Sequence, residues 1–352
     1  MSKATLICGG AGFIGTNLAH RLASQGGQVI LYDNLSRPGV EKNLEWLKAE
    51  HGHRLEVHVA DMLDRRSLRK AVAGADQVFN FAAQVAVTTS LVDPIDDFER
   101  NARGTLNLLE EIRRMDQPPS LIFTSTNKVY GGLEDVSLKL RGERYEPEDS
   151  LISRYGISEK RPLDFHSPYG CSKGCADQYV LDYARSFGLK TAVFRMSCIY
   201  GFHQCGNEDQ GWVAHFLIKA LQGEPITIYG DGKQVRDILF VEDLVDAFLL
   251  AQSNIEEVRG QAFNIGGGPS NTVSLLELLD VIEKLDGRRP RVAFDGWRTG
   301  DQRCYISDTR KFRLATGWKP RYSAPEGIEA LYRWLGGEAS GTVPTLKGEV
   351  PA

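Results

Sequence analysis

The sequence predicts an α/β fold with a doubly wound parallel sheet and a smaller C-terminal lobe. Short apolar runs alternate with amphipathic helical patterns through the first half of the 352-residue chain, which is typical of parallel sheets covered by helices. A glycine-rich turn joins the first apolar run to the first helical pattern, as it does in many doubly wound sheets. The alternation becomes less regular after about residue 196, so the later helices and short strands are expected to form the second lobe.

Composition and charge argue against several classes of protein. The chain has 42% hydrophobic residues, 25% charged residues and a net charge of -4, so no basic field indicates nucleic acid or an anionic membrane as a partner. The N-terminus has no apolar signal segment, and no apolar run approaches the ~20 residues that span a bilayer. A cytoplasmic location is expected. The six cysteines form no Cys-x-x-Cys pair and have no histidines at zinc spacing, which predicts reduced thiols and no metal site.

The first apolar run, residues 4–8, is expected to be the first strand. Gly9, Gly12 and Gly15 follow at once, before an amphipathic helix that continues to about Ser24. Glycine permits a tight turn, close approach of the backbone to a pyrophosphate, and close packing of the helix on the strand. The N-terminus of this helix would face the anion. The segment therefore predicts a dinucleotide site.

The second strand is expected at residues 28–33, and it ends in an acid. Asp33 lies about eighteen residues after Gly15, where a carboxylate can accept hydrogen bonds from an adenosine ribose. A carboxylate there would also repel a 2'-phosphate, which favours NAD over NADP, although Arg37 lies nearby. A helix N-cap is the alternative role for Asp33.

Polar and small residues follow the next strands of the predicted sheet. Asp61 could cap the adenine amino group, and Ala82-Ala83-Gln84 offers small residues where a dinucleotide would cross the sheet edge. Asn101 either hydrogen-bonds backbone to position a ribose or occupies a solvated helix position. Further strands are expected at residues 55–60, 77–81, 119–125 and 189–195, with a long helix from about 95 to 115.

A polar segment of unusual length follows the strand at 119–125. Hydroxyl side chains at that strand's end, in the run from Thr124 to Gly131, are expected to face the site. Residues 132–165 are too hydrophilic for a core and too long for an ordinary connection. They are interpreted as a lid or an oligomer arm.

Tyr169 and Lys173 lie four residues apart on the next predicted helix. A tyrosine hydroxyl has a pKa near ~10 in water, and a cation one helical turn away favours the phenolate. Tyr169 could thereby act as a base near neutrality. The alternative is a solvated helix face, on which such pairs also occur.

These motifs together resemble the extended short-chain dehydrogenase/reductase superfamily. The resemblance rests on the Gly-Gly-Ala-Gly-Phe-Ile-Gly turn, Thr-Ser-Thr-Asn-Lys-Val-Tyr-Gly, Tyr-x-x-x-Lys and Val-Arg-Asp at 235–237. Within it, the segments at 163–174, 209–213 and 232–237 resemble those of the CDP-tyvelose (CDP-paratose) 2-epimerases. The resemblance implies a Rossmann domain that holds NAD tightly, a catalytic triad of Thr126, Tyr169 and Lys173, and a nucleotide-sugar substrate.

The resemblance also implies two sets of binding residues. The cofactor set comprises Gly9, Gly12, Phe13, Ile14, Asp33, Asn34, Ser36, Arg37, Asp61, Met62, Phe81, Ala82, Ala83, Gln84, Asn101, Thr124, Tyr169 and Lys173. The substrate set comprises Thr88, Asn127, Cys198, Gln210, Gly211, Val213, Tyr229, Arg236, Arg298 and Asp301.

Three residues of the second half carry alternatives. Arg236 and Arg298 match positions that clamp the substrate pyrophosphate in nucleotide-sugar epimerases, although either could instead form a surface ion pair. Cys198 departs from the asparagine common at its position, which puts a contact to substrate phosphate in doubt. His166 is either a second base or, as we favour, a residue that shapes the loop before Tyr169.

The predicted domains are an NAD-binding domain at 1–195 with 235–268, a substrate lobe at 196–234 with 269–335, and a flexible tail at 336–352. A homo-oligomer, dimer or tetramer, is expected. Dehydratases of the superfamily carry an Asp-Glu pair after the strand-end threonine, whereas this chain has Asn127-Lys128, which disfavours dehydration. A 4-epimerase and a non-catalytic dinucleotide sensor remain as alternatives.

Overall fold

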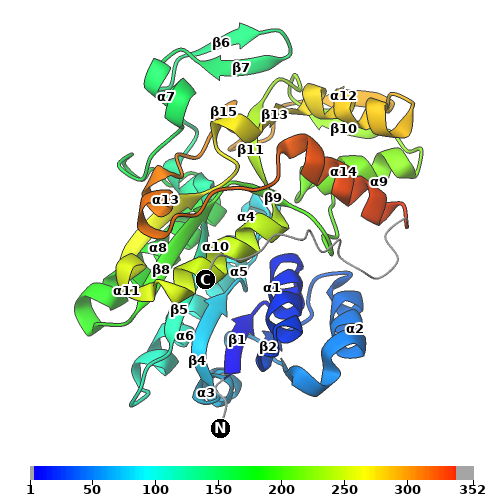
Figure 1. The fold of residues 1–352 in the computed structure, drawn as a ribbon. Helices are drawn as coiled ribbons and strands as arrows, with labels where there is room; N and C mark the ends of the chain where they lie inside the picture. The colour runs from blue at the N-terminus through cyan, green and yellow to red at the C-terminus, as the bar shows by residue number, and fades with distance from the viewer. Residues whose placement is uncertain (1–3, 338–352) are drawn as a thin grey trace.

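The largest element of the fold is a seven-stranded parallel sheet. A computed structural model describes residues 4–337 of the chain (Figure 1). Within them the strand order of this sheet is β12-β8-β5-β4-β1-β2-β3. The order reverses between β1 and β4, and such a switch point is where ligands bind in doubly wound sheets. The strands are β1 (Ala4–Cys8), β2 (Val29–Asp33), β3 (Leu55–Val59), β4 (Ala75–Asn80), β5 (Ser120–Thr126), β8 (Thr191–Met196) and β12 (Gln261–Ile265).

Helices cover both faces of this sheet, as a doubly wound fold requires. Apolar side chains of α1, α2 and α10 form one core with the sheet, and those of α3, α6 and α8 form a second core on its other face. The predicted α/β fold class is confirmed, and the six predicted strands agree within two residues at each end. The helices are α1 (Phe13–Ser24), α2 (Val40–His51), α3 (Arg65–Ala73), α6 (Gly104–Arg113), α8 (Ser167–Phe187) and α10 (Val241–Ser253).

The long helix expected at about 95–115 is interrupted. It consists of α5 (Pro94–Phe98), a π-helical turn η2 (Glu99–Arg103) and α6. A π turn inserts one residue per turn relative to an α-helix and therefore changes the face that later residues present. This irregularity cannot be read from apolar spacing alone.

The smaller lobe is built from short strands and three helices. Strands β9, β11, β13 and β15 form one sheet, and β10 pairs with β14 in another. Helices α9, α12 and α14 share an apolar core with the first of these sheets. The elements are β9 (Cys198–Tyr200), α9 (Trp212–Leu221), β10 (Ile226–Tyr229), β11 (Val235–Phe240), β13 (Thr272–Ser274), α12 (Leu275–Asp286), β14 (Val292–Asp295), β15 (Cys304–Tyr305) and α14 (Ala324–Leu335).

The predicted domain bounds stay a prediction. Of the elements assigned to the NAD-binding domain at 235–268, α10 and β12 pack with the large sheet, whereas β11 pairs with β9 of the smaller sheet. Residues 338–352 of the predicted tail lie outside the described residues, and no helix within 4–337 is long and apolar enough to cross a membrane. The remaining elements are η1 (Gly52–Arg54), α4 (Val87–Val92), η3 (Asn127–Tyr130), β6 (Leu138–Arg141), β7 (Arg144–Pro147), α7 (Ser150–Tyr155), α11 (Ile255–Val258), η4 (Pro269–Asn271) and α13 (Arg310–Thr316).

The polar insertion folds against the smaller lobe. Its strands β6 and β7 form a hairpin. The backbone N–H of Tyr145 donates to the Lys233 carbonyl at 3.0 Å, and the Tyr145 hydroxyl donates to Asp231 at 2.6 Å. Arg144 on the same strand donates to the Thr272 hydroxyl at 2.6 Å. Figure 1 shows the hairpin standing beside β13 and β15, at the end of the molecule away from α3.

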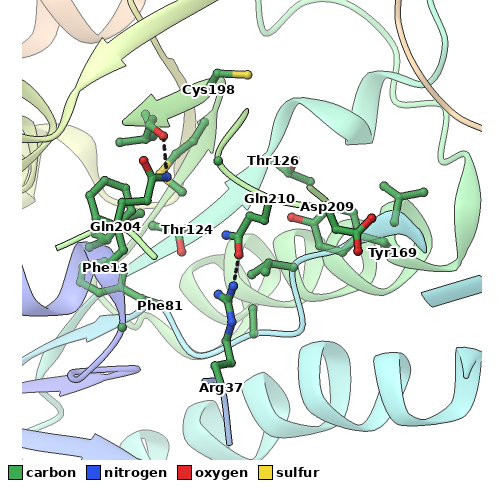
Figure 2. A pocket seen from close by; sticks show the side chains of 18 of the residues that line it. Phe13, Arg37, Phe81, Thr124, Thr126, Tyr169, Cys198, Gln204, Asp209 and Gln210 are labelled. Carbon is green, nitrogen blue, oxygen red and sulfur yellow. Dashed lines mark hydrogen bonds between the residues drawn. The ribbon is translucent and has the colours of Figure 1, made fainter. Parts of the chain in front are cut away.

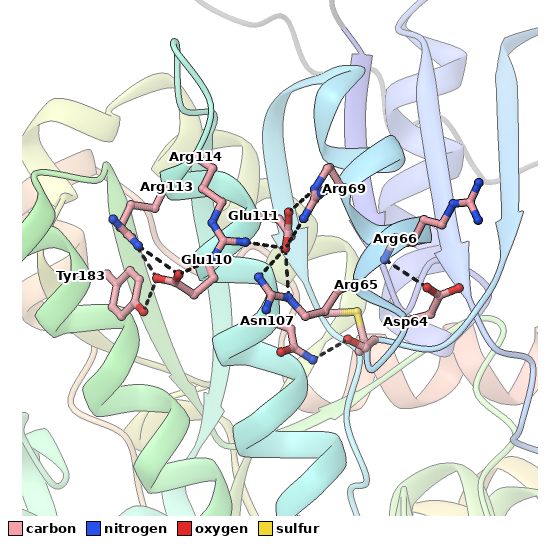
Figure 3. Close-up of polar contacts among 11 residues, drawn as sticks. Asp64, Arg65, Arg66, Arg69, Asn107, Glu110, Glu111, Arg113, Arg114 and Tyr183 are labelled. Carbon is pink, nitrogen blue, oxygen red and sulfur yellow. Dashed lines mark hydrogen bonds and ion pairs between the residues drawn. The ribbon is translucent and has the colours of Figure 1, made fainter.

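An ion-pair network joins α3 to α6 on the outer face of the large domain (Figure 3). The Glu111 carboxylate is only 1% exposed, and it accepts from Arg65 at 2.7 Å, from Arg69 at 2.8 Å and from Arg114 at 3.2 Å. These contacts lower the pKa of Glu111, with the hydrogen bond from Arg69 as the largest cause. The network stabilises the packing of these helices.

Candidate active site

A cavity of about 460 Å³ lies at the carboxyl ends of the large sheet's strands, between the two lobes. This is where doubly wound folds bind ligands. Every residue of the predicted cofactor and substrate sets lines the cavity except Gln84 and Asn101. Figure 2 shows that side chains from both lobes point into it. The structure describes all of residues 132–165, and none of them lines the cavity; the interpretation of the insertion as a lid or an oligomer arm stays a prediction.

The glycine turn between β1 and α1 leaves room only for backbone. Gly9 has φ +78°, and a Cβ atom there would lie 2.8 Å from the Ala82 nitrogen. A Cβ atom on Gly15 would lie 2.2 Å from the Gly9 carbonyl oxygen. Gly12 is the N-cap of α1 and supplies no side-chain cap, so the helix presents its free N–H groups to the cavity. This cradle fits the pyrophosphate of NAD.

Asp33 is held at the end of β2 by the glycine turn. Its carboxylate accepts from the backbone N–H of Ala11 at 3.0 Å and from that of Leu35 at 2.9 Å. Burial raises the pKa of Asp33, and these hydrogen bonds oppose the shift. The N-caps of α1 and α2 are Gly12 and Gly39, so the alternative role of Asp33 as a helix N-cap is wrong. A contact from its carboxylate to a ribose stays a prediction.

Asp61 is fixed by its own neighbours at the rim of the cavity. Asn34 donates to its carboxylate at 2.7 Å, and the backbone N–H of Leu63 donates to it at 2.9 Å. The Tyr32 hydroxyl donates to the Asp61 carbonyl at 2.7 Å. These contacts hold the Asp61 carboxylate beside the cavity. A hydrogen bond from the adenine amino group to this carboxylate stays a prediction.

Gln84 and Asn101 lie outside the cavity, contrary to the expectation that they line the cofactor site. Asn101 is 1% exposed, which excludes the solvated alternative. Its side-chain oxygen accepts from the backbone N–H of Gln84 at 2.9 Å, and its amide donates to Ser172 at 3.0 Å and to Asp97 at 3.2 Å. The predicted hydrogen bond to backbone is therefore present. Asn101 faces inward because η2 packs against α8, and it fixes the loop after β4.

The three predicted catalytic residues come together at the end of β5. Tyr169 and Lys173 are 9% and 3% exposed, so the alternative of a solvated helix face is wrong. The Tyr169 hydroxyl is hydrogen-bonded to Thr126. The Lys173 ammonium donates to the Thr124 carbonyl at 2.6 Å and lies 4.3 Å from the centre of the Phe123 ring.

Burial controls the pKa of both groups on α8. It raises the pKa of Tyr169 to about 12, which the hydrogen bond with Thr126 opposes. It lowers the pKa of Lys173 to about 7. The expectation that Lys173 makes the tyrosine a base near neutrality is therefore wrong for these residues by themselves. Burial is the largest cause of the raised pKa of Tyr169, and the charge that opposes it comes from Arg37.

The helix that carries these groups begins in a strained conformation. Ser167 has φ +65°, which is uncommon for a residue other than glycine. Its hydroxyl accepts from the backbone N–H of Gly170 at 3.2 Å. His166 does not line the cavity, and its Nε2 atom lies 3.0 Å from Asp164. This arrangement supports the loop-shaping role of His166 over a role as base.

The two predicted arginines of the substrate set differ in their surroundings. Arg236 is 7% exposed, donates to the Val235 carbonyl at 2.8 Å, and lies 4.0 Å from Asp301. Arg298 lies 3.7 Å from the centre of the Tyr229 ring. It also donates to the Glu208 carbonyl at 2.7 Å and lies 3.4 Å from Asp209. Their predicted contact with a pyrophosphate stays a prediction.

Other predicted substrate residues are held by hydrogen bonds to residues that are distant in the sequence. The indole N–H of Trp212 donates to the sulfur of Cys198 at 3.4 Å. Asn127 donates to Gln302 at 3.0 Å. Arg37, from the loop after β2, donates to Gln210 of the smaller lobe (Figure 2). This hydrogen bond joins the two lobes across the cavity.

Several cavity residues were not singled out from the sequence. Lys128 follows the strand-end hydroxyls directly, and a charged residue so close to a buried strand is a usable signal. The others lie in segments without a regular pattern, so only the fold brings them to the cavity. They include Ser197, Gln204, Glu208, His215 and Thr299.

The chain is similar to known proteins over nearly its whole length. The model of the NAD dependent epimerase/dehydratase family matches residues 5–266. The CDP-paratose 2-epimerase of Salmonella typhi is 45% identical over 94% of this chain and 98% of its own. The UDP-glucose 4-epimerase of Thermotoga maritima, solved with UDP-glucose, is similar with a TM-score of 0.81 and 30% identity, over 95% of this chain and 99% of its own. The UDP-glucuronic acid 4-epimerase of Bacillus cereus, solved with UDP-glucuronic acid and NAD, has a TM-score of 0.81 and 26% identity, over 96% and 100%.

Proposed function

The chain belongs to the NAD dependent epimerase/dehydratase family, and we propose that it inverts C2 of a CDP-3,6-dideoxyhexose, interconverting CDP-paratose and CDP-tyvelose. Family membership makes it an NAD-dependent nucleotide-sugar epimerase, an isomerase with NAD as its cofactor. The 45% identity to the Salmonella typhi CDP-paratose 2-epimerase supports the substrate and the carbon. The reaction at C2 is the part that the proposal adds.

One observation about the cavity carries the choice of reaction. The residues that follow Thr126 in the wall of the cavity are Asn127 and Lys128, which supply an amide and an ammonium. Elimination of water needs carboxyl groups to protonate and deprotonate the sugar. The site therefore offers the groups for oxidation and reduction of a hydroxyl-bearing carbon, and it lacks the acidic pair at these positions that dehydration would use.

The substrate's own chemistry favours oxidation at C2. Inversion by proton exchange at C2 would need a ketone at C1 or C3. A 3,6-dideoxyhexose has no oxygen at C3, and its C1 holds the nucleotide. Oxidation of the C2 hydroxyl to a ketone is then the available route, and reduction from the opposite face gives the inverted sugar.

The described residues can divide this work among them. Tyr169 removes the proton of the C2 hydroxyl and returns it, while Thr126 hydrogen-bonds the same oxygen. Bound NAD would accept a hydride from C2 and return it, and its positive charge would favour the Tyr169 phenolate. Lys173, one helical turn after Tyr169 on α8, is fixed at the end of β5 by its bond to the Thr124 carbonyl. Arg236 anchors the phosphate end while the planar sugar rotates to present its other face.

Isotope labelling combined with a substrate panel tests the proposal. The protein is incubated with CDP-, UDP-, GDP- and dTDP-sugars, and the configuration at each ring carbon is read by NMR. We expect inversion at C2 of the CDP-dideoxyhexose, with a deuterium at C2 retained and no solvent deuterium incorporated. Washout of the label, or inversion at C4 alone, would overturn it.

Two alternatives give different results in the same assay. A UDP-sugar 4-epimerase, the activity named for the similar Thermotoga maritima protein, would invert C4 of UDP-sugars. A non-catalytic NAD-binding sensor would invert nothing and would show no transient reduced nicotinamide. The buried set of Thr126, Tyr169 and Lys173 argues against a sensor, because binding alone does not need it.

We also propose that the protein forms the predicted homo-oligomer through the exposed apolar side chains of α4 and α5, which contact each other. Four large apolar side chains are exposed within eight residues of the chain there, and exposed apolar patches mark interaction sites. A mass measurement by light scattering tests this, and a monomer at micromolar concentration would contradict it. These residues are Leu91, Val92, Ile95 and Phe98.

A further inference from the structure

Lys128 is a cavity cation to which the proposed function gives no task. About a fifth of its side chain is exposed, at 19%. Its ammonium donates to the Gly300 carbonyl at 2.8 Å and lies 3.8 Å from the Asp301 carboxylate. Its backbone N–H donates to the Thr126 hydroxyl oxygen at 3.2 Å. Lys128 is therefore tied both to the reacting end of the cavity and to the loop that carries Asp301.

The charges around Lys128 do not balance. The Asp301 carboxylate also lies 4.0 Å from the guanidinium of Arg236, so one carboxylate faces two cations. Burial and then the charge of Arg236 lower the pKa of Lys128 to about 8. Arg298, by contrast, lies 3.4 Å from one carboxylate and 4.0 Å from another. The pair of Lys128 and Arg236 is therefore a part of the cavity wall with excess positive charge, where an anion is stabilised.

The position of this pair relative to the reacting carbon identifies the anion, and this step rests on the proposed function. Thr126 is expected at the C2 hydroxyl, and the backbone N–H of Lys128 donates to the Thr126 hydroxyl oxygen, so both residues line the cavity from one short segment. In a nucleotide sugar, C1 carries the sugar-side phosphate and is bonded directly to C2. A cationic side chain on the segment of Thr126 can therefore reach that phosphate while C2 reacts. In a C4 substrate, C1 lies on the opposite side of the ring.

We propose that Lys128 and Arg236 together bind the sugar-side phosphate of the nucleotide sugar, so that Lys128 is a substrate-binding residue that favours reaction at C2. Asp301 holds the two cations side by side. The sugar can then rotate about its bond to a phosphate that stays in place. The ring carbon next to that phosphate is the one kept beside Thr126 and Tyr169.

Two nucleotides that differ by one phosphate test this assignment. CDP has a terminal phosphate at the sugar-side position, and CMP lacks it. Binding of each to the NAD-loaded protein is measured by calorimetry for the wild type, Lys128→Gln and Lys128→Arg. Lys128→Arg keeps the charge and a side-chain donor, so it separates loss of charge from a general effect of substitution. We expect Lys128→Gln to weaken CDP binding about tenfold or more with CMP unchanged, and Lys128→Arg to keep the preference for CDP.

Lys139→Gln is the matched control, because Lys139 is exposed on β6 and does not line the cavity. Equal losses for CDP and CMP, no loss for either, or the same loss in Lys128→Arg as in Lys128→Gln would overturn the assignment. Binding of UDP and UMP is measured in parallel. If the wild type inverts C2 while Lys128→Gln binds CDP normally, only this assignment fails. If Lys128→Gln loses CDP selectively in a protein that inverts C4, the proposed function fails and the phosphate site stands.

Discussion

The two halves of the cavity are built in different ways. On the cofactor side, most contacts are made by the backbone. The glycine turn packs against the backbone of Ala82, and the N–H groups of Ala11 and Leu35 hold Asp33. On the substrate side, charged side chains meet across the sequence. Lys128 bonds a carbonyl 172 residues away, and Arg298 bonds one 90 residues away.

This difference separates two kinds of dependence. A site made of close backbone contacts depends on shape, so one added carbon atom can destroy it. A site made of charges depends on how each cation is balanced, so neutralising one side chain changes affinity without changing the fold. Tyr169 and Lys173 lie between the two sides and follow neither pattern, because burial disfavours the charged form of each.

The largest effect is expected for Tyr169→Phe, which should abolish the reaction without weakening the binding of NAD or of the nucleotide. Tyr169→Phe keeps the buried ring but removes the hydroxyl that moves the proton. Turnover should fall by about 10²–10⁴-fold, with bound NAD and nucleotide affinity unchanged. Steady-state kinetics and the nicotinamide released on denaturation measure these quantities. Tyr179→Phe, on an exposed part of the same helix, is the control. A near-normal rate in Tyr169→Phe would place the base elsewhere in the cavity.

The next effect tests the dependence of the cofactor side on shape. A Cβ atom in Gly15→Ala would meet the Gly9 carbonyl oxygen at 2.2 Å, so the turn must move. We expect purified Gly15→Ala to contain little NAD, whereas the wild type carries about one equivalent without any being added, and the free energy of unfolding should fall by about 1–3 kcal/mol. Gly52→Ala meets no atom within 4 Å and should match the wild type. NAD retained by Gly15→Ala would show that the cradle is not needed for binding.

The same difference explains what could be predicted from the sequence. The cofactor side is formed by contiguous motifs at strand ends, and its strands, glycine turn and Asp33 were placed correctly. Gln84 and Asn101 do not line the cavity: Gln84 lies in the loop after β4, and Asn101 lies in the π turn η2, which changes the face of the helix. No apolar pattern signals such a turn.

The substrate side was predicted mainly through resemblance, which named Arg236, Arg298 and Asp301 but not Lys128. The role of Lys128 depends on Asp301 and Gly300, and no local pattern brings these residues together. The prediction of a lowered pKa for Tyr169 was wrong for a related reason. Spacing along a helix gives the distance between two side chains, whereas burial, which depends on the whole fold, raises that pKa to about 12.

A smaller effect concerns the charge on Lys173. Burial lowers its pKa from 10.5 to about 7, so between pH 7 and 10.5 the unfolded chain binds more protons than the folded one. Stability then rises with pH across this window. The wild type should gain stability relative to Lys173→Met from pH 7 to pH 10, as measured by urea denaturation at each pH. A difference between the two proteins that does not change with pH would contradict the shift.

The smallest effect is expected for charges remote from the cavity, in the network of Figure 3. Arg69→Ala removes a side chain that is 62% exposed, and Glu111 keeps its contacts with Arg65 and Arg114. Exposed ion pairs contribute little, so the thermal midpoint should shift by less than about 2 °C, with turnover, bound NAD and CDP affinity unchanged. Glu111→Gln should lower the midpoint more, because the carboxylate is buried and shared by three arginines. A change in CDP affinity in Arg69→Ala would mean that charges far from the cavity affect binding. The local charges of Lys128, Arg236 and Asp301 would then no longer be enough to explain CDP affinity.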